Sequence, residues 1–163
     1  PAPFGGVVVH RSTSVTSVQL PNKVIEAGAW MLENGHRAAL KVTGGRWPTS
    51  VLGMEPVELH TIGRTSGQRR STMLSAPIYE PDRVVLVASK GGHEKDPDWY
   101  RNLVAEPQVE VTARGVTTPM TARTASAEEK AALWSTITSA YGGYEGYQRR
   151  TDRDIPVVIC EPR

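Results

Sequence analysis

The chain has 163 residues, of which 39% are hydrophobic and 22% are charged, and its formal net charge is +2 at pH 7. This composition predicts one globular domain with a sizeable core, and the charge is too small to indicate general nucleic-acid binding. The single cysteine, Cys160, excludes an intramolecular disulfide and favours a reducing cytoplasm as the compartment. No apolar run reaches the roughly 18 residues of a membrane-spanning helix, so any membrane contact is expected at its surface.

The first third of the sequence predicts an arm and a helix. Residues 1–20 are rich in Ser, Thr and Val without a clear period, which predicts a flexible arm. Over residues 21–45 apolar side chains recur at spacings of three and four, which predicts an amphipathic helix. This helix carries Lys23, Arg37 and Lys41, and it is expected to pack on the domain or, as the less favoured alternative, to touch a membrane peripherally. Residues 50–163 are expected to form the main domain.

Six β-strands are predicted in the main domain from apolar runs bounded by turn residues. They span 56–62, 70–79, 83–88, 109–113, 116–124 and 156–160. The continuous run Val84–Val87 predicts burial on both faces. Two helices interrupt the strands: one begins around Asp96 and Pro97, and the other begins at the capping box Ser126–Glu129. Strands of mostly antiparallel character with few helices predict a mainly β (α+β) fold, a small barrel with flanking helices.

A basic turn after the first strand is the most informative feature for function. It holds three arginines and two glycines and no acid: Gly63, Arg64, Gly67, Arg69 and Arg70. Backbone N–H groups and guanidinium forks presented together suit a phosphate or a carboxylate. A second glycine-bearing loop, Lys90 to Gly92, follows a buried strand and would let a planar ligand approach the backbone. A solvated basic β-turn is the structural alternative to a binding site.

Aromatic residues form a second candidate region. Tyr141, Tyr144 and Tyr147 recur every three residues among glycines, a spacing that would place the rings on one helical face. The glycines favour a partly open aromatic wall whose hydroxyls bind or protonate a substrate oxygen, and a tyrosine stripe packed on the barrel is the alternative. Trp99 is favoured as a core anchor over a ligand-stacking ring, and Asn102 lies on nearly the same helical face.

Several other kinds of site lack support. The four histidines are scattered without ligand spacing, so no metal site is expected. The serines have no nucleophile-elbow context, and neither a P-loop nor a dinucleotide fingerprint occurs. The two glycine-bearing loops therefore remain the favoured candidates.

Six ordered motifs resemble the deazaflavin-dependent nitroreductase family, actinobacterial oxidoreductases that use coenzyme F420. They are Gly63–Arg70, Ala88–Gly92, Pro97–Leu103, the three spaced tyrosines, Thr151–Pro156 and Val157–Pro162. The resemblance runs from about residue 55 to the C-terminal end of the sequence. It implies a split β-barrel related to flavin-binding proteins, with a groove for a reduced deazaflavin that carries a phosphate and an oligoglutamate tail.

The resemblance also implies roles for individual residues. The anionic tail would be held by Arg64, Thr65, Ser66, Gly67 and Arg70. The ring and its linker would lie against Lys90, Gly91, Trp99 and Asn102. Tyr141, Tyr144 and Ser75 would bind the substrate, and Tyr147, helped by Ser89, would orient the acceptor or deliver a proton. Two departures from the family stand out: Thr65 replaces a basic residue of some relatives, and Ser75 replaces a bulky aromatic of one relative, which implies a wider substrate pocket.

The expected function is hydride transfer from the reduced deazaflavin to a small-molecule electron acceptor, namely a quinone, an activated enone or a nitro compound. Two alternatives stay open. One is an FMN-dependent oxidoreductase on the same type of barrel, and the other is a non-catalytic protein that binds a deazaflavin or a lipophile. No nucleic-acid partner is expected. The natural acceptor and the oligomeric state do not follow from the sequence.

Overall fold

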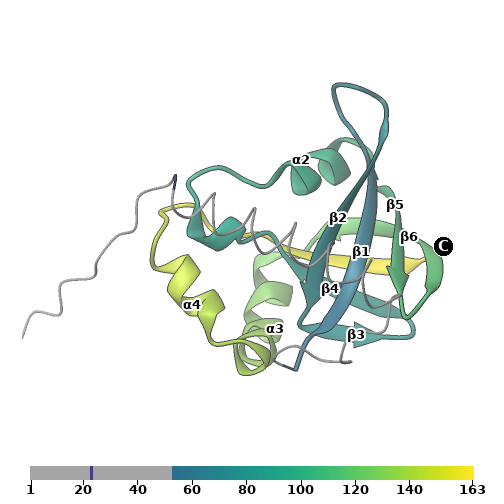
Figure 1. Cartoon of the computed structure of the whole chain (residues 1–163). Helices are drawn as coiled ribbons and strands as arrows, with labels where there is room; N and C mark the ends of the chain where they lie inside the picture. Colours follow the sequence, from purple (N-terminus) through teal and green to yellow (C-terminus); the bar gives the residue numbers. More distant parts are fainter. Residues whose placement is uncertain (1–22, 24–52) are drawn as a thin grey trace, which may run out of the picture.

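The computed structural model describes residues 53–163 together with Lys23 (Figure 1). The predicted arm over residues 1–20 lies outside the described residues. The same holds, apart from Lys23, for the predicted helix over residues 21–45 and for the membrane contact expected of it. In the part of the chain that the structure describes, no helix is long and apolar enough to cross a membrane.

Seven strands form one antiparallel sheet in the order β2-β1-β5-β6-β7-β4-β3. They are β1 (Glu55–Ile62), β2 (Arg69–Ala76), β3 (Ile78–Glu80), β4 (Arg83–Val87), β5 (Gln108–Ala113), β6 (Val116–Thr124) and β7 (Val157–Pro162). The sheet curls until β2 contacts β4, which makes it a half-barrel (Figure 1). The predicted mainly β, split-barrel fold is confirmed.

The prediction of one strand over residues 70–79 is wrong, because the chain divides there into β2 and β3. Pro77 lies at the division, and a proline has no N–H group to continue a ladder of strand hydrogen bonds. Before this residue β2 pairs with β1, and after it β3 pairs with β4. The described part of the chain therefore has seven strands where six were predicted.

The sheet is buried on both faces along its central strands. In β4, Val84 and Leu86 point into the barrel core, whereas Val85 and Val87 belong to a second core on the outer face. Successive side chains of a strand point to opposite faces, so a continuous apolar run indicates cover on both sides. The predicted two-sided burial of residues 84–87 is confirmed.

Within residues 53–163, four helical elements lie around the sheet: the 3₁₀ turn η1 (Lys90–Gly92), α2 (Asp98–Ala105), α3 (Ala127–Ala140) and α4 (Gly143–Gln148). Trp99 and Leu103 of α2 are buried in the barrel core. Residues of α3 and α4 cover the outer core, where Ile137 is fully buried. The predicted capping box of α3 is present, because Ser126 and Glu129 exchange backbone-to-side-chain hydrogen bonds.

The start of α2 differs from the prediction. Pro97 occupies the N-cap position and makes no side-chain capping bond. The Asp96 carboxylate, predicted to cap this helix, instead accepts a hydrogen bond of 2.9 Å from Arg153. The sequence pattern thus found the helix, but a distant ion pair takes the carboxylate that was expected to cap it.

Candidate functional site

The basic turn between β1 and β2 is a compact, internally bonded loop. The Gly67 amide donates to the Gly63 carbonyl at 2.7 Å, and the Gly63 amide donates to the Gln68 carbonyl at 2.8 Å. Gly67 has a φ of 65°, a conformation that favours glycine. A Cβ on Gly63 would lie 2.5 Å from the Ser66 hydroxyl oxygen, so only glycine fits there without a shift. The turn therefore holds the side chains of residues 64–66 at the surface.

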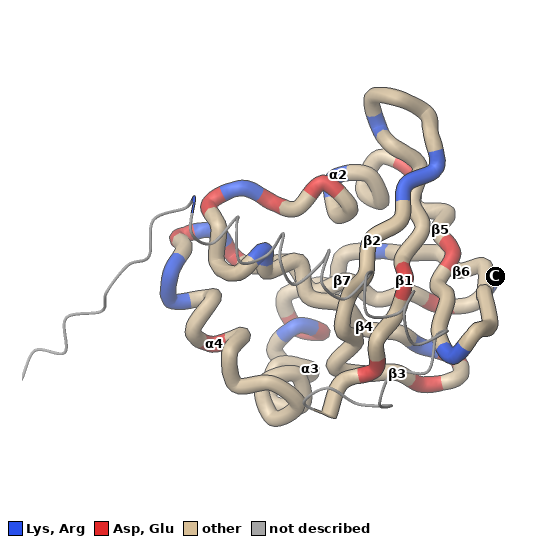
Figure 2. Tube along the Cα trace, in the orientation of Figure 1, with Lys and Arg blue, Asp and Glu red and all other residues tan. Residues whose placement is uncertain are grey.

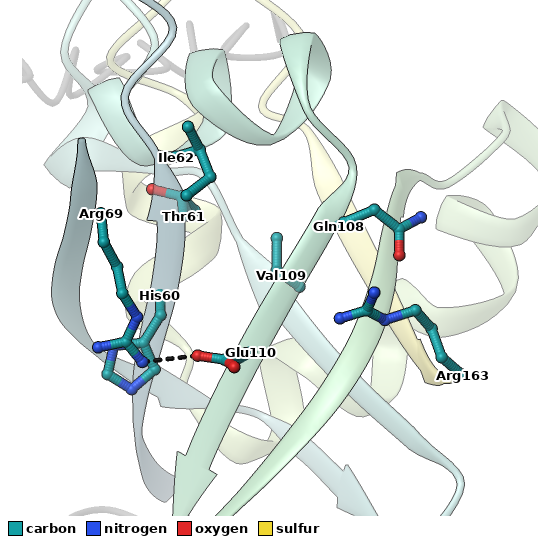
Figure 3. Close-up of a pocket in the computed structure, with 8 residues that line it drawn as sticks. All are labelled: His60, Thr61, Ile62, Arg69, Gln108, Val109, Glu110 and Arg163. Carbon is teal, nitrogen blue, oxygen red and sulfur yellow. Dashed lines mark hydrogen bonds and ion pairs between the residues drawn. The ribbon is translucent and has the colours of Figure 1, made fainter. Parts of the chain in front are cut away.

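The three arginines of this turn do not act together. Arg70 donates to the Ser66 hydroxyl at 3.4 Å, and Arg64 donates to the Thr65 hydroxyl at 3.2 Å. Arg69 points to the opposite face of β2 and pairs with Glu110 at 2.6 Å (Figure 3). Figure 2 shows the positive charge that the turn carries beyond the end of α2. Arg64 and Arg70 are therefore the guanidinium groups that this turn presents without a carboxylate partner among the described residues.

Asn102 of α2 holds the turn in place. Its side-chain oxygen accepts the Arg64 amide at 3.1 Å, and its side-chain nitrogen donates to the Thr61 hydroxyl at 3.2 Å. The side chain is buried, so its hydrogen bonds are made within the protein. Asn102 was expected to line a ring pocket, and the structure places it behind the turn as a brace between α2 and β1.

The second predicted loop has an unusual backbone. Lys90, Gly91 and Gly92 have φ values of 45°, 64° and 83°, so three successive residues are left-handed. A Cβ on Gly92 would lie 2.7 Å from the Tyr147 carbonyl oxygen, which makes glycine necessary at that position. The loop is therefore packed directly on α4. Because α2 begins shortly after η1 and also contacts the β1–β2 turn, the two candidate loops flank one helix (Figure 1).

Arg153 fixes this loop, and sequence reasoning assigned it no role. Its guanidinium donates to the carbonyls of Ala88 at 2.9 Å, Ser89 at 2.8 Å and His93 at 2.8 Å. It also pairs with Asp96 at 2.9 Å, and its side chain is only 14% exposed. The signal that could have found it is the motif Thr151–Pro156, in which Arg153 is the one arginine.

The three tyrosines form one cluster but not one helical face. Tyr141 ends α3, whereas Tyr144 and Tyr147 belong to α4. The centroids of the rings lie 5.3 to 6.1 Å apart. The prediction of a shared helical face is wrong for Tyr141, because α3 ends there and α4 begins at Gly143 with Gly142 as its N-cap, yet packing still brings the rings together.

The three hydroxyl groups have different surroundings. Tyr141 and Tyr147 share a hydrogen bond of 3.2 Å and are half-buried. Tyr144 is buried in the outer core, where its hydroxyl donates to the Met54 sulfur at 3.7 Å. Burial and the bond from Tyr141 raise the pKa of Tyr147 to about 12. Tyr147 therefore keeps its proton at neutral pH.

Three further residues of the predicted site are Trp99, Ser89 and Ser75. Trp99 is 7% exposed and packs edge-on against Tyr100 within the barrel core, which agrees with its interpretation as a core anchor. Ser89 immediately precedes η1 and is half-buried. Ser75 is a half-buried residue of β2, opposite Pro56 in the register of β1.

A separate depression lies on the outer face of β1 and β5 (Figure 3). It has a volume of about 220 Å³, and its lining residues are His60, Thr61, Ile62, Arg69, Gln108, Val109, Glu110 and Arg163. His60 bonds Thr112 through Nε2 at 2.9 Å, and burial lowers the pKa of its imidazole. This depression contains none of the residues predicted for the cofactor or the substrate.

The structure is a half-barrel sheet with two glycine-bearing loops, each of which carries exposed or half-buried cationic side chains. The family model described as F420H(2)-dependent quinone reductase matches residues 33–162. The chain belongs to this family, and it is therefore an oxidoreductase whose cofactor is the deazaflavin F420 and whose partner is a small-molecule acceptor.

Individual relatives agree with the family. The F420H(2)-dependent quinone reductase Rv1261c of Mycobacterium tuberculosis is 36% identical over 132 residues, which are 78% of this chain and 88% of that protein. A solved structure described as an F420-H2 dependent reductase (FDR-A) has 40% identity and a TM-score of 0.59, and the match covers 65% of this chain and 93% of that one. Another solved structure, described as a domain-swapped dimer, has 35% identity and a TM-score of 0.61, and the match covers 83% of this chain and 99% of that one.

Proposed function

We propose that this protein reduces quinones with reduced F420, and that activated enones and nitro compounds are further acceptors. The observation that carries the proposal is the packing of Gly92 on the carbonyl of Tyr147. This contact joins the candidate cofactor loop to the tyrosine cluster. A cofactor held at the loop and an acceptor held at the tyrosines would therefore be neighbours, as a transfer between them requires.

The residues of both loops suit an anionic deazaflavin. Arg64 and Arg70 are exposed, one beside the Thr65 hydroxyl and the other beside the Ser66 hydroxyl, and guanidinium groups bind phosphate and carboxylate in a bidentate manner. Thr65, Ser66 and Gly67 would add hydroxyl and amide donors to the tail. Lys90 and Gly91 would lie against the ring or its linker, where the small glycine allows close approach. When it is bound, the reduced deazaflavin supplies the hydride.

Buried residues support this site from behind. Asn102 sets the position of the turn through the Arg64 amide, and Trp99 anchors α2 in the barrel core. In the proposal, neither needs to touch the ring to act. Both are more completely buried than a residue that stacks on a ligand would be expected to be.

The tyrosine cluster would receive the acceptor. The Tyr147 hydroxyl is protonated at physiological pH, as phenols ordinarily are, and its raised pKa extends this to higher pH, so it has a proton to donate to an acceptor oxygen. The hydrogen bond with Tyr141 orients that hydroxyl, and the Ser89 hydroxyl would assist. Tyr144 would support the wall from within the core, and Ser75 would leave room for a wider substrate.

Binding and turnover test the proposal. The protein is titrated with oxidised F420 and, separately, with FMN, while cofactor fluorescence is followed. We expect binding of F420, no binding of FMN, and oxidation of reduced F420 when menadione is added. Binding of FMN alone would instead support an FMN-dependent oxidoreductase. F420 binding without turnover of menadione, cyclohexenone or a nitroimidazole would support a sequestering protein.

A further inference from the structure

Arg153 lies between α4 and β7 and reaches back to a segment about sixty residues earlier in the sequence. All three nitrogens of its guanidinium donate: Nε to the His93 carbonyl, Nη1 to the Asp96 carboxylate, and Nη2 to the carbonyls of Ala88 and Ser89. These distances lie between 2.8 and 2.9 Å. The acceptors flank the Lys90–Gly92 loop on both sides.

The loop has little else to fix its orientation. The bonds that close it are local, from the Gly92 amide to the Ser89 carbonyl and from the His93 amide to the Lys90 carbonyl. Such bonds form the turn but do not determine how it sits on the sheet. Two glycines in succession also have a wide choice of backbone angles. The distant contacts around the left-handed loop are the close packing of Gly92 on α4 and Arg150, the bond from the Ala88 amide to the Pro156 carbonyl at 2.9 Å, and the bonds from Arg153. Of these, Arg153 alone bonds the chain on both sides of the loop.

An arginine suits this task for a geometric reason. Its planar fork presents five N–H donors in fixed directions, and here it meets three carbonyls and one carboxylate at once. A lysine ammonium is a compact point charge on a flexible stem, so it cannot span the same four acceptors. Asp96 supplies the opposite charge that a largely buried guanidinium needs.

We propose that Arg153 is a positioning residue for cofactor binding, which sets the conformation of the Lys90–Gly92 loop and acts through that loop. The inference rests on the proposed function, in which this loop holds the deazaflavin. Arg153 does not need to touch the ligand, since all of its nitrogens are engaged by the protein. It also links the loop to the helix of Tyr144 and Tyr147, because Gln148 of α4 donates to the Arg153 carbonyl at 2.8 Å.

The test compares Arg153→Gln, Arg153→Lys and Asp96→Asn with the control Arg123→Gln. Arg123 is another arginine paired with a carboxylate, since its Nη1 and Nη2 donate to the two oxygens of Glu129, but it lies on β6. Two quantities are measured: the amide ¹H–¹⁵N shifts of Gly91 and Gly92 without cofactor, and the dissociation constant for oxidised F420.

We expect Arg153→Gln and Arg153→Lys to move both glycine amide peaks and to raise the dissociation constant at least tenfold. Asp96→Asn keeps the fork and should cause a smaller change in both quantities. Arg123→Gln should leave both unchanged. A lysine variant that behaves like the natural protein would overturn the proposal, because charge alone would then suffice.

The two quantities separate this inference from the proposed function. If the natural protein does not bind F420, the proposed function fails, while displaced glycine peaks in the Arg153 variants still support control of the loop. If the natural protein binds F420 and the variants bind it equally well, the inference fails and the function stands. Should Arg153→Gln not fold, Asp96→Asn and Arg153→Lys give the same comparison, and unmoved peaks in both would refute the inference.

Discussion

The arginines at the β1–β2 turn divide into those that face the proposed cofactor site and one that does not. Arg69 and Arg70 are neighbours in sequence, yet β-strand alternation sends them to opposite faces. Arg69 is paired with Glu110 on the outer face, whereas Arg70 stays beside Ser66. This division supplies a matched control for the cofactor site, because one arginine can be removed without touching the other.

We therefore expect Arg64→Ala and Lys90→Ala each to weaken F420 binding by about 1–3 kcal/mol, the scale of a lost charge-assisted hydrogen bond. Arg69→Ala should leave the affinity unchanged, because its guanidinium lies on the outer face. Fluorescence titration of the three variants checks this. Equal affinities in all three would place the ligand elsewhere on the molecule.

A second prediction concerns the tyrosine hydroxyls. Tyr147→Phe removes the group that bonds Tyr141, and we expect slower quinone reduction with an unchanged dissociation constant for F420. Tyr144→Phe is the control, because its hydroxyl is buried on Met54 and should not affect turnover. Since the pKa of Tyr147 is raised to about 12, this phenol should contribute no loss of rate between neutral pH and about pH 10. Full activity of Tyr147→Phe in steady-state assays would remove it as the proton donor.

At the scale of elements, α3 is stabilised at its first turn by charges that respond to pH. The hydrogen bonds from Arg123 and from the Ser126 amide hold the pKa of Glu129 at about 2, below the ordinary 4.5. A depressed carboxyl pKa contributes stability above the unfolded-state value, and that stability is lost as the pH falls through the folded-state value. The relevant window therefore runs from about pH 4.5 down to about pH 2.

We expect the melting temperature to fall as the pH is lowered through this window, and Glu129→Gln to flatten the fall. Arg123→Gln should flatten it too, because the guanidinium is the main cause of the shift. The double variant should then show about the same pH dependence of the melting temperature as either single variant. Thermal unfolding followed by circular dichroism measures the effect, and an unaltered pH slope in Glu129→Gln would contradict it.

How far the elements could be predicted depends on whether their cause is local. The capping box of α3 and the hairpin at Arg114 and Gly115 follow from neighbouring residues, and both are present. The break between β2 and β3 has a local signal, Pro77, but the partners of the two strands, β1 for β2 and β4 for β3, do not follow from any local pattern. The basic turn was visible in the sequence, but the separation of Arg69 from Arg70 required the outer-face partner Glu110.

In the candidate site too, features that depend on residues distant in the sequence could not be predicted. Glycines at 63 and 92 were visible as hinges, and each proves to lie against a close neighbour. Arg153 could not be assigned from the sequence alone, since its partners are about sixty residues away. For Tyr144 and Asn102, the sequence spacing indicates a shared face but not burial, and the structure adds that both side chains are buried.

At the scale of the whole molecule, the reactivity of the Cys160 thiol can be used to measure the opening of the half-barrel. It is fully buried in the barrel core, and burial raises the pKa of its thiol to about 12. A thiol reacts as the thiolate, so the native protein should resist labelling until it unfolds. Each labelling event should therefore mark a global opening of the half-barrel.

We expect a thiol reagent to label the native protein slowly and the urea-unfolded protein at once. Leu86→Ala, which empties space in the same core, should lower the free energy of unfolding by about 2–5 kcal/mol and speed the labelling. Val116→Ala is the control, because this side chain is 65% exposed. Rapid labelling of the native protein, measured by absorbance or mass spectrometry, would show that the core opens locally.

The position of β7 has a consequence for how the molecule is made. This strand, the last in the chain order of the described residues, lies between β6 and β4 and joins the two parts of the sheet. During synthesis the β3–β4 hairpin emerges from the ribosome long before the strand that connects it to β6. Until residue 162 has left the exit tunnel, the edge of β4 that pairs with β7 therefore has no partner strand, and its apolar residues must be shielded in another way. A chain that ends after Thr124 and before Val157 would carry two incomplete sheets, each with an open edge available for aggregation.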